Sequence, residues 1–488
     1  MRRRLVLTYP NLLWLKFDPV TTWNLSPATL CQLGAVARDV VDVSVVDGQF
    51  LNLSIDEYAE KVTENDPDFV GVSLLSSEYG QALHIAAEAI KKRKPDTIII
   101  AGGVHVTREY EQVIADKTID YAVRGDGEYI LRDLLAHLCG EGPMPETGVV
   151  YRDGGKVVTL PQAIVENLED LPMPDYGLFD MADFARRAYA YRLGPTNPPE
   201  LPGVRITITR GCPLECSFCQ VKLISGARIR ARSADQVVEE LALLRDRYGV
   251  KSVIFDDDNL ISSKRYFKDL LSRMIDARLD IKFTVGAFAL FSLDDEMLDL
   301  LAEAGCVGMN IAIESGSQRV LDEIVRKPIK LQAVPEWIRK IKAKGIFVAS
   351  NFMLGFPGET WDEIRQTVHF AETCGAEYVK FFMATPLPDT ALWEMAEKQG
   401  VLKISKKLEE KCERWGSRSG HGTAEIISDE WTPEDIRILR AYEWDRINFG
   451  DPVKRRRTIE IWKSDEETIN RIRKDTRDSI TFGSGGRH

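Results

Sequence analysis

The sequence is constrained most by an alternation of short apolar runs with amphipathic stretches, which begins at its first residues. The apolar runs are "RLVLTYP", "VVDVSVVDG", "DFVGVSLLS", "DTIIIAGG" and "DYAVRGDGE". Amphipathic stretches such as residues 78–93 separate them. Apolar runs of this length between helical patterns are typical of buried parallel strands in βαβ units. The alternation predicts an α/β domain over residues 1–140, with a doubly wound, Rossmann-like sheet that binds its ligand beyond the carboxyl ends of its strands.

The same alternation returns over residues 205–388. Strand candidates lie at 205–209, 251–257, 281–287, 307–315, 345–355 and 377–384, and helical stretches at 234–248, 263–279, 293–304, 331–344 and 360–374. A complete eight-stranded barrel takes about 250 residues. The six βα units found here therefore predict a partial (β/α)6 barrel.

Two segments break the alternation. Residues 141–204 are dense in Pro and Gly, as in "EGPMPETG" and "LGPTNPPELPG", and predict a linker. Residues 389–488 are highly charged. Within them "WTPEDIRILRAYEWDRINF" has Thr432 as an N-cap before a proline, which predicts a mainly helical C-terminal extension. The last residues, near 480–488, predict a disordered tail.

Charge and apolar content exclude several classes of partner. Lys plus Arg is 64 and Asp plus Glu is 75, so the net charge is −11, which argues against a broad nucleic-acid-binding surface. No stretch reaches the roughly 18 apolar residues that cross a bilayer. The start of the chain is typical of a strand and not of a signal peptide. We expect a cytoplasmic protein without nucleic-acid or membrane partners.

Three of the eight cysteines, Cys212, Cys216 and Cys219, form a C-x3-C-x2-C cluster. The other five are scattered singly, which fits a reducing compartment. A structural zinc site needs four ligands. The next cysteine is Cys306. A fourth ligand from a distant part of the chain would complete a zinc site, so the sequence does not exclude zinc. An iron–sulfur cluster takes thiolate ligands, so that three cysteines leave one iron free for chemistry.

The position of the cysteines favours a catalytic cluster. They directly follow "RITIT", the first strand of the predicted barrel. The loops at the carboxyl ends of barrel strands build active sites, whereas a structural metal can lie anywhere. The sequence therefore predicts a reactive metal centre at the mouth of the barrel.

The motif "CPLECSFC" after a strand resembles the cluster motif of the radical S-adenosylmethionine (SAM) superfamily. "GARIRARSADQVVEEL", "FDDDNL", "IAIESGSQRVL" and "NFMLGFPGET" resemble further motifs of that family. The resemblance implies a [4Fe–4S] cluster on the three cysteines, whose open iron binds SAM. It also implies an external electron donor, such as flavodoxin or ferredoxin, and a deoxyadenosyl radical. The SAM contacts it implies are Phe218, Arg230, Arg232, Asp257, Glu314, Ser315, Asn351 and Gly355.

The first domain has no G-x-G-x-x-G at its first helix and no P-loop, which disfavours a dinucleotide. Its segments "GVSLLSS", "AGGVHVT" and "VRGDGE", and the following "LPMPDYGLFD", resemble the cobalamin-binding subclass of the same family. The cobalamin contacts implied are Asp47, Gln49, Ser73, Ser76, Gly102, Gly103, His105, Gly125, Gly127 and Glu128. Gln49 stands where an Asp-x-His ligand would place its histidine, so base-off cobalamin without that lower ligand is implied. His105 is a substitute ligand, but a lone histidine is more often structural.

The resemblance implies a cobalamin-dependent (class B type) methyltransferase that acts on an unactivated carbon of a small molecule or peptide in a biosynthetic pathway. In this subclass the C-terminal extension covers the barrel mouth. A ring-forming, ring-contracting or oxidative enzyme without methyl transfer is the alternative. A non-catalytic electron carrier or zinc-stabilised binding protein is a third reading. The sequence identifies neither the substrate nor a residue that transfers protons.

Overall fold

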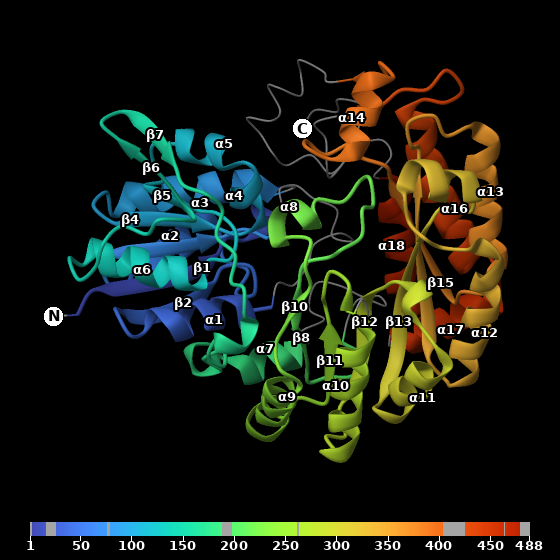
Figure 1. Ribbon diagram of the computed structural model, residues 1–488, viewed down its shortest axis with the longest axis horizontal. Coiled ribbons are helices and arrows are strands. Elements are labelled where there is room, and N and C mark those ends of the chain that lie inside the picture. Colours follow the sequence, from blue (N-terminus) through green and yellow to red (C-terminus); the bar gives the residue numbers. More distant parts are fainter. Residues whose placement is uncertain are drawn as a thin grey trace.

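The computed structural model describes residues 2–15, 26–75, 79–187, 198–260, 263–403, 425–462 and 464–478. Two α/β units stand side by side, with the N-terminal unit in blue to teal and the C-terminal unit in green to red (Figure 1). Ser76 and the tail at 480–488, which carry two of the expectations above, lie outside the described residues. No helix in the described ranges is long and apolar enough to cross a membrane.

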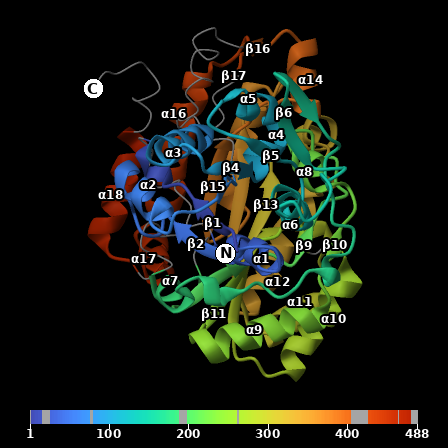
Figure 2. The ribbon, with the colours of Figure 1, turned by 90° about the vertical axis from the view of Figure 1, so that its left-hand side faces the viewer.

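The N-terminal sheet has the strand order β2-β1-β3-β4-β5-β6-β7. Its parallel strands are β1 (Arg4–Tyr9), β2 (Asp42–Asp47), β3 (Phe69–Ser73), β4 (Ile98–Gly102) and β5 (Tyr121–Val123). Helices α1 (Ala28–Ala37), α2 (Ile55–Thr63), α3 (Gly80–Arg93), α4 (Val104–Arg108), α5 (Tyr110–Ala115) and α6 (Glu128–Leu138) lie between and after the strands in the chain (Figure 2). All of β3 is buried, as expected for a strand covered on both faces. The doubly wound prediction is confirmed.

The sheet continues beyond residue 140, into the segment predicted to be a linker. Strands β6 (Val149–Asp153) and β7 (Lys156–Thr159) form a hairpin that pairs antiparallel with β5. Gly154 and Gly155 make its turn, with φ of +53° and +83°. The two strands are short and surrounded by Gly and Pro, so their apolar pattern is weak. The boundary expected at residue 140 therefore falls inside the first domain.

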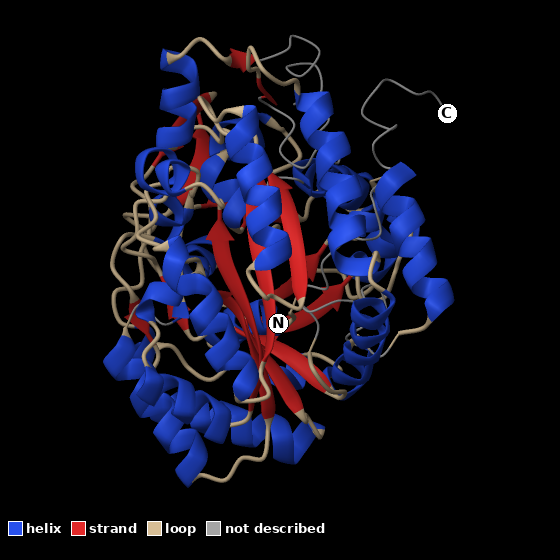
Figure 3. Ribbon diagram, turned by 90° about the vertical axis from the view of Figure 1, so that its right-hand side faces the viewer, coloured by secondary structure: helices blue, strands red, loops and turns tan. Residues whose placement is uncertain are grey.

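The C-terminal sheet has six parallel strands in the order β15-β14-β13-β12-β11-β8, as the alternation predicts. They are β8 (Gly203–Ile206), β11 (Ser252–Phe255), β12 (Lys282–Phe288), β13 (Cys306–Glu314), β14 (Phe347–Leu354) and β15 (Tyr378–Met383). The connecting helices are α9 (Ala234–Tyr248), α10 (Lys264–Asp276), α11 (Asp295–Glu303), α12 (Val334–Ala343) and α13 (Trp361–Thr373). Strands β8 and β15 do not pair, so the barrel is open. Figure 3 shows its strands with helices around them.

The C-terminal extension is mainly helical where it is described, with one short antiparallel pair of strands, β16 (Leu402–Lys403) and β17 (Glu425–Ile426). It contains α14 (Ala391–Lys398), α16 (Pro433–Phe449), α17 (Pro452–Ile461) and α18 (Glu466–Asp478). Helix α16 packs beside β15, the open edge of the barrel. There the Asn448 side chain accepts from Val379 N at 2.8 Å and donates to Val379 O at 2.9 Å. One buried amide thus completes the hydrogen bonds of an edge strand that would otherwise be unsatisfied.

Replacing Asn448 by Ala is expected to lower the free energy of unfolding by about 2–3 kcal/mol, because it removes the side chain that pairs the buried Val379 N–H and C=O. Urea denaturation followed by circular dichroism measures the change. Gln366→Ala, on the exposed face of α13, is the control and should leave the midpoint unchanged. A similar midpoint shift in both variants would contradict this role.

Candidate active site

The carboxyl-end loops of the two domains meet beside the three cysteines. Helix α4, after β4, contacts α8 (Val221–Ser225), which directly follows the cysteine loop (Figure 1). Arg108 at the end of α4 forms an ion pair with Asp389, in the loop after β15. Gln162 also donates to Ile224 O, at 2.7 Å. These contacts bring the carboxyl ends of both parallel sheets, where ligands bind in such folds, to one place.

The loop with Cys212, Cys216 and Cys219 is fixed at several backbone positions. Cys212 N donates to Gly226 O at 3.2 Å, and Ser217 N donates to Val325 O at 3.0 Å. Leu392 N donates to Ser217 O at 2.8 Å. The loop that carries the cysteines is therefore held by backbone hydrogen bonds to three other segments of the chain.

Burial raises the pKa of Cys216 to about 12 and that of Cys219 to about 11. A metal takes the thiolate, so cluster assembly releases these protons. Asn259 Nδ2 lies 3.5 Å from Cys212 Sγ, within reach of a weak hydrogen bond to sulfur. Among the described residues, no three His, Cys, Asp or Glu side chains converge on a single-ion site.

Asp257, expected near SAM, holds the strand that leads into the cysteine loop. Its Oδ1 accepts from Ile208 N at 2.9 Å, from Thr209 N at 2.5 Å and from Thr209 Oγ1 at 2.8 Å. Burial raises its pKa to about 7 despite these hydrogen bonds. Its buried Oδ2 has no partner among the described residues. One carboxylate oxygen therefore fixes the start of the loop and the other is open to a ligand.

Glu314, the last residue of β13, is strained and buried. Its φ is +75°, a left-handed conformation that is uncommon for residues other than glycine. Its Oε1 accepts from Lys327 Nζ at 2.8 Å, and both side chains are less than a tenth exposed. Lys327 lies two residues after Val325, whose carbonyl binds the cysteine loop. Such strain persists where the surroundings hold it, most often at functional sites.

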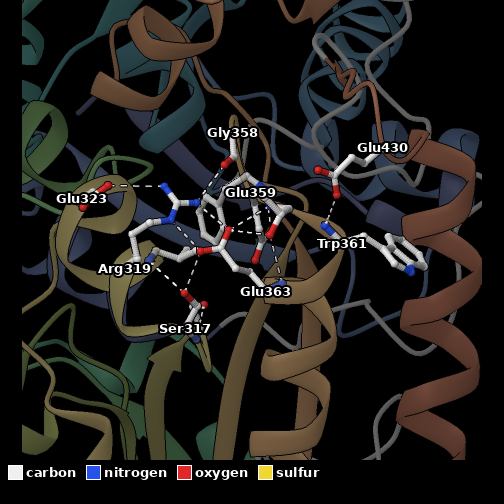
Figure 4. A network of polar contacts seen from close by, with 12 residues as sticks. Ser317, Arg319, Glu323, Gly358, Glu359, Trp361, Glu363 and Glu430 are labelled. Atoms are coloured by element: carbon white, nitrogen blue, oxygen red, sulfur yellow. Dashed lines mark hydrogen bonds and ion pairs between the residues drawn. The ribbon is translucent and has the colours of Figure 1, made fainter.

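The turns after β13 and β14 are joined by one polar network, drawn in Figure 4. Arg319 donates to both carboxylate oxygens of Glu363 at 2.6 Å and to Gly358 O at 2.9 Å. Ser317 Oγ donates to Glu363 Oε1 at 3.1 Å. Arg319 is the main cause that lowers the pKa of Glu363 to about 2. These contacts hold the "ESGS" and "GFPGET" segments together.

Ser315 and Asn351, both expected to face SAM, have different surroundings. The Ser315 hydroxyl is fully buried and lies 3.1 Å from Thr367 Oγ1. Asn351 Oδ1 is buried without a partner among the described residues. By strand register, Thr284, Asn310 and Asn351 point to the same face of the sheet, and each has a buried oxygen without a partner in the described part of the chain. That face is suited to a polar ligand.

Gly355, directly after β14, adopts φ +85°. A Cβ there would lie 3.3 Å from Ile436 and 3.4 Å from Trp431, so the extension packs on this strand end. Trp431 Nε1 donates to Glu359 O at 2.9 Å. The ring of Phe218 lies 6.5 Å from that of Phe356, which joins the cysteine loop to the same strand end.

Arg230 and Arg232 are both engaged by groups of the protein. Arg230 is buried and donates to Asp126, Val165 O and Ser225 O. Arg232 forms an ion pair with the buried Glu240 on α9. Because both guanidinium groups are already paired with carboxylates, neither offers a free charge to the carboxylate of SAM. Both arginines thus make contacts within the chain, and their expected contact with SAM stays a prediction.

The residues expected to contact cobalamin lie at the carboxyl ends of the N-terminal strands. Asp47 ends β2, Gln49 follows it, Ser73 ends β3, and Gly102 ends β4 with open space where a Cβ would stand. Gly103 has φ +102°, and a Cβ on it would lie 2.4 Å from Leu74 O, so only glycine fits.

The other expected cobalamin contacts are less open. His105 is buried, and burial lowers its pKa to about 3, so the ring is neutral. Gly125 and Gly127 follow β5, and a Cβ on Gly125 would lie 2.0 Å from Ala163 O. Glu128 is held by Arg210. The loop after β5 thus faces the barrel domain.

Sequence reasoning missed Lys327, Asn259, Arg210 and Trp431 as residues of this region. Asn259 stands in "FDDDNL" and Arg210 directly precedes "GCPLEC", so closer reading of the quoted motifs could have found both. No local pattern marks Lys327, which follows a short π-helical turn at Val320–Val325.

Comparison with known proteins agrees with this geometry. The radical SAM superfamily model matches residues 206–371, and the B12 binding domain model matches residues 24–135. An uncharacterized methyltransferase of Pyrococcus horikoshii is 31% identical over 77% of this chain and 79% of its own length. The chain belongs to the cobalamin-binding radical SAM family.

Two further matches support this assignment. Cytidylyl-2-hydroxyethylphosphonate methyltransferase of Streptomyces wedmorensis is 27% identical over 76% of this chain and 78% of its own length. The radical SAM methyltransferase TsrM of Kitasatospora setae, solved with cobalamin and a [4Fe–4S] cluster, shares the fold with a TM-score of 0.73 at 18% identity. That match covers 99% of this chain and 100% of TsrM.

The cofactors of this family are a [4Fe–4S] cluster, SAM and cobalamin, and the residues present fit them. Three cysteines share one ordered loop, and Asp257, Asn259 and Asn351 keep buried oxygens without partners among the described residues. The open space at Gly102 lies at a strand end of the doubly wound sheet. These are the positions at which a cluster, a polar nucleoside and a corrin can bind.

Proposed function

We propose that this protein transfers a methyl group from cobalamin to an unactivated carbon of a small-molecule or peptide substrate, as class B radical SAM methyltransferases do. The observation that carries the proposal is the direct contact between the carboxyl-end loops of the two domains beside the cysteine loop. Arg108–Asp389 on one side and Arg210 with Asp126 and Glu128 on the other bring these loops together.

The two-centre arrangement suits a demanding reaction. An sp3 carbon has neither the acidity nor the nucleophilicity that ordinary methyl transfer needs. When bound, the cluster supplies the electron that cleaves SAM to a radical able to remove a hydrogen atom, and cobalamin supplies the methyl group. Cys212, Cys216 and Cys219 would hold the cluster. Reduced flavodoxin or ferredoxin would supply two electrons per turnover, one for SAM cleavage and one to return cobalamin to the state that accepts a methyl group from SAM.

The remaining residues have binding and positioning roles in this proposal. Asn351 and the free oxygen of Asp257 offer hydrogen-bond acceptors to SAM, and Phe218 lines the cysteine-loop side. Trp431 and Ile436 close the strand end at Gly355, which limits the access of water to a radical. Asp47, Ser73 and Gly102 lie at the strand ends that receive cobalamin.

Anaerobic reconstitution with iron, sulfide and cobalamin, followed by reduction in the presence of SAM and candidate substrates, tests the function. We expect two SAM consumed per turnover, one as deoxyadenosine and one as S-adenosylhomocysteine, and a product heavier by one methylene group. Deoxyadenosine without S-adenosylhomocysteine would contradict methyl transfer and favour the ring-forming or oxidative alternative. Cluster binding without any SAM cleavage would contradict a catalytic role.

A further inference from the structure

Two arginines that flank the cysteine loop are held by acids of the other domain. Arg210 donates to Asp126 Oδ1 at 2.8 Å and to both carboxylate oxygens of Glu128. Arg230 donates to Asp126 Oδ2. Asp126 is thus shared, one oxygen to each arginine. The side chains of Asp126, Glu128 and Arg230 are all less than a tenth exposed. We call these four residues the interdomain clasp.

On the barrel side, the clasp contacts both strands of a short antiparallel pair at the start of the cysteine loop. Strands β9 (Thr209–Arg210) and β10 (Arg230–Ala231) pair antiparallel, with Arg210 opposite Arg230. Gly211 follows at φ +90°, and a Cβ there would lie 2.3 Å from Arg228 O. Cys212 is the next residue. Because only Gly211 separates Arg210 from Cys212, a shift of the Arg210 backbone also moves the first cluster ligand.

On the N-terminal side, the clasp is tied to the strand ends that receive cobalamin. Asp126 N donates to Ala163 O at 3.0 Å, and its Oδ2 accepts from Val165 N at 2.8 Å. The preceding Gly125 N donates to Thr107 Oγ1 at 3.0 Å. Thr107 Oγ1 in turn donates to Gly103 O at 2.9 Å. Hydrogen bonds thus run without a break from the loop after β4 to the clasp.

The charges of the clasp leave little freedom for other partners. Arg210 and Arg230 outweigh the burial of Asp126 and lower its pKa. A buried ion pair is costly to break, because the partner that remains is an uncompensated charge. Bidentate guanidinium–carboxylate contacts also fix orientation as well as distance. Such a contact specifies one relative placement of the two domains.

We propose that Asp126, Glu128, Arg210 and Arg230 are positioning residues that set the distance and orientation between the cluster loop and the cobalamin domain. According to this proposal, the acids of "VRGDGE" bind the barrel, and Glu128 does not make the cobalamin contact expected of it. Arg230 likewise binds Asp126 and does not bind SAM. A methyl carrier and a radical source on separate domains must be held at a defined separation, since a misplacement of about 1 Å costs about 100-fold in rate.

Two conservative variants test this on the full-length protein. Glu128→Gln keeps the shape of the side chain and removes its charge. Thr107→Val keeps the volume and removes the hydrogen bonds to Gly103 and Gly125, without touching the clasp charges. Arg446→Gln is the control, because it breaks a bidentate ion pair with Glu372 that lies outside the domain contact.

The primary readout is the magnetic interaction between the reduced cluster and cob(II)alamin, measured by electron paramagnetic resonance. We expect Glu128→Gln and Thr107→Val to bind iron and cobalamin in normal amounts but to show an altered spin–spin splitting, whereas Arg446→Gln keeps that of the original protein. An unchanged splitting in both test variants would overturn the proposal. Loss of cobalamin from Glu128→Gln with the cluster intact would also overturn it, since Glu128 would then be a cobalamin contact.

A second readout rests on the proposed function. We expect the methylated product per deoxyadenosine to fall at least about tenfold in the test variants, while SAM cleavage itself is retained. If the original protein forms no S-adenosylhomocysteine, the proposed function fails, but the magnetic measurement still tests the clasp. An unchanged product ratio together with an altered splitting would support the clasp's role in setting geometry but would contradict its expected effect on methyl transfer.

Discussion

Replacing Cys216 by alanine is expected to abolish both the iron–sulfur absorption of the reconstituted protein and the formation of deoxyadenosine. A cluster that is bound by three thiolates is not held when only two of these ligands remain. We expect the same complete loss for Cys212→Ala and Cys219→Ala. Iron content, the visible spectrum and deoxyadenosine after reduction measure the outcome.

Cys374→Ala is the matched control for these variants. Cys374 is buried at the end of α13, outside the loop, and its thiol lies 3.6 Å from Ala371 O. Its replacement should lower stability modestly and leave iron binding and SAM cleavage intact. Full activity in any one of the three cysteine-loop variants would show that this cysteine is not a cluster ligand.

The fold was predictable because its signal is repeated along the chain. Each βα unit carries its own apolar run and its own amphipathic helix, so an error in predicting one unit does not change the prediction of the others. Helix α9 begins and ends where the pattern predicts, at Ala234 and Tyr248. The hairpin of β6 and β7 has no such support, because its strands are short, partly exposed and separated only by the turn at Gly154 and Gly155.

The site was predictable only where its residues are neighbours in the sequence. The three cysteines lie within eight positions, and their spacing alone predicts that they bind a metal. The partners of Arg230 could not be read in this way. The acid that Arg230 contacts, Asp126, is 104 residues away in the sequence and belongs to the other domain. Ion-pair partners are chosen by the tertiary fold, so a motif predicts a charge without predicting what that charge binds.

The buried pair of Glu314 and Lys327 shows the same limit and has a large expected effect. Lys327→Met removes the cation that compensates Glu314, and we expect the free energy of unfolding to fall by about 3–5 kcal/mol, the usual cost of one unpaired buried charge. Denaturant unfolding of the apoprotein measures it. Lys344→Met, which breaks the exposed contact with Asp299, is the control and should change stability little.

The double variant separates pairing from packing. If the loss in Lys327→Met comes from the charge left on Glu314, adding Glu314→Gln should restore part of the stability, so that the two changes are strongly non-additive. Additive losses would contradict the pairing.

The strained backbone of Glu314 predicts a second effect, on SAM affinity measured by equilibrium dialysis of the cluster-loaded protein. Because Val325 O binds the cysteine loop and Lys327 anchors the segment that contains it, Lys327→Met should weaken SAM binding even where iron content is normal.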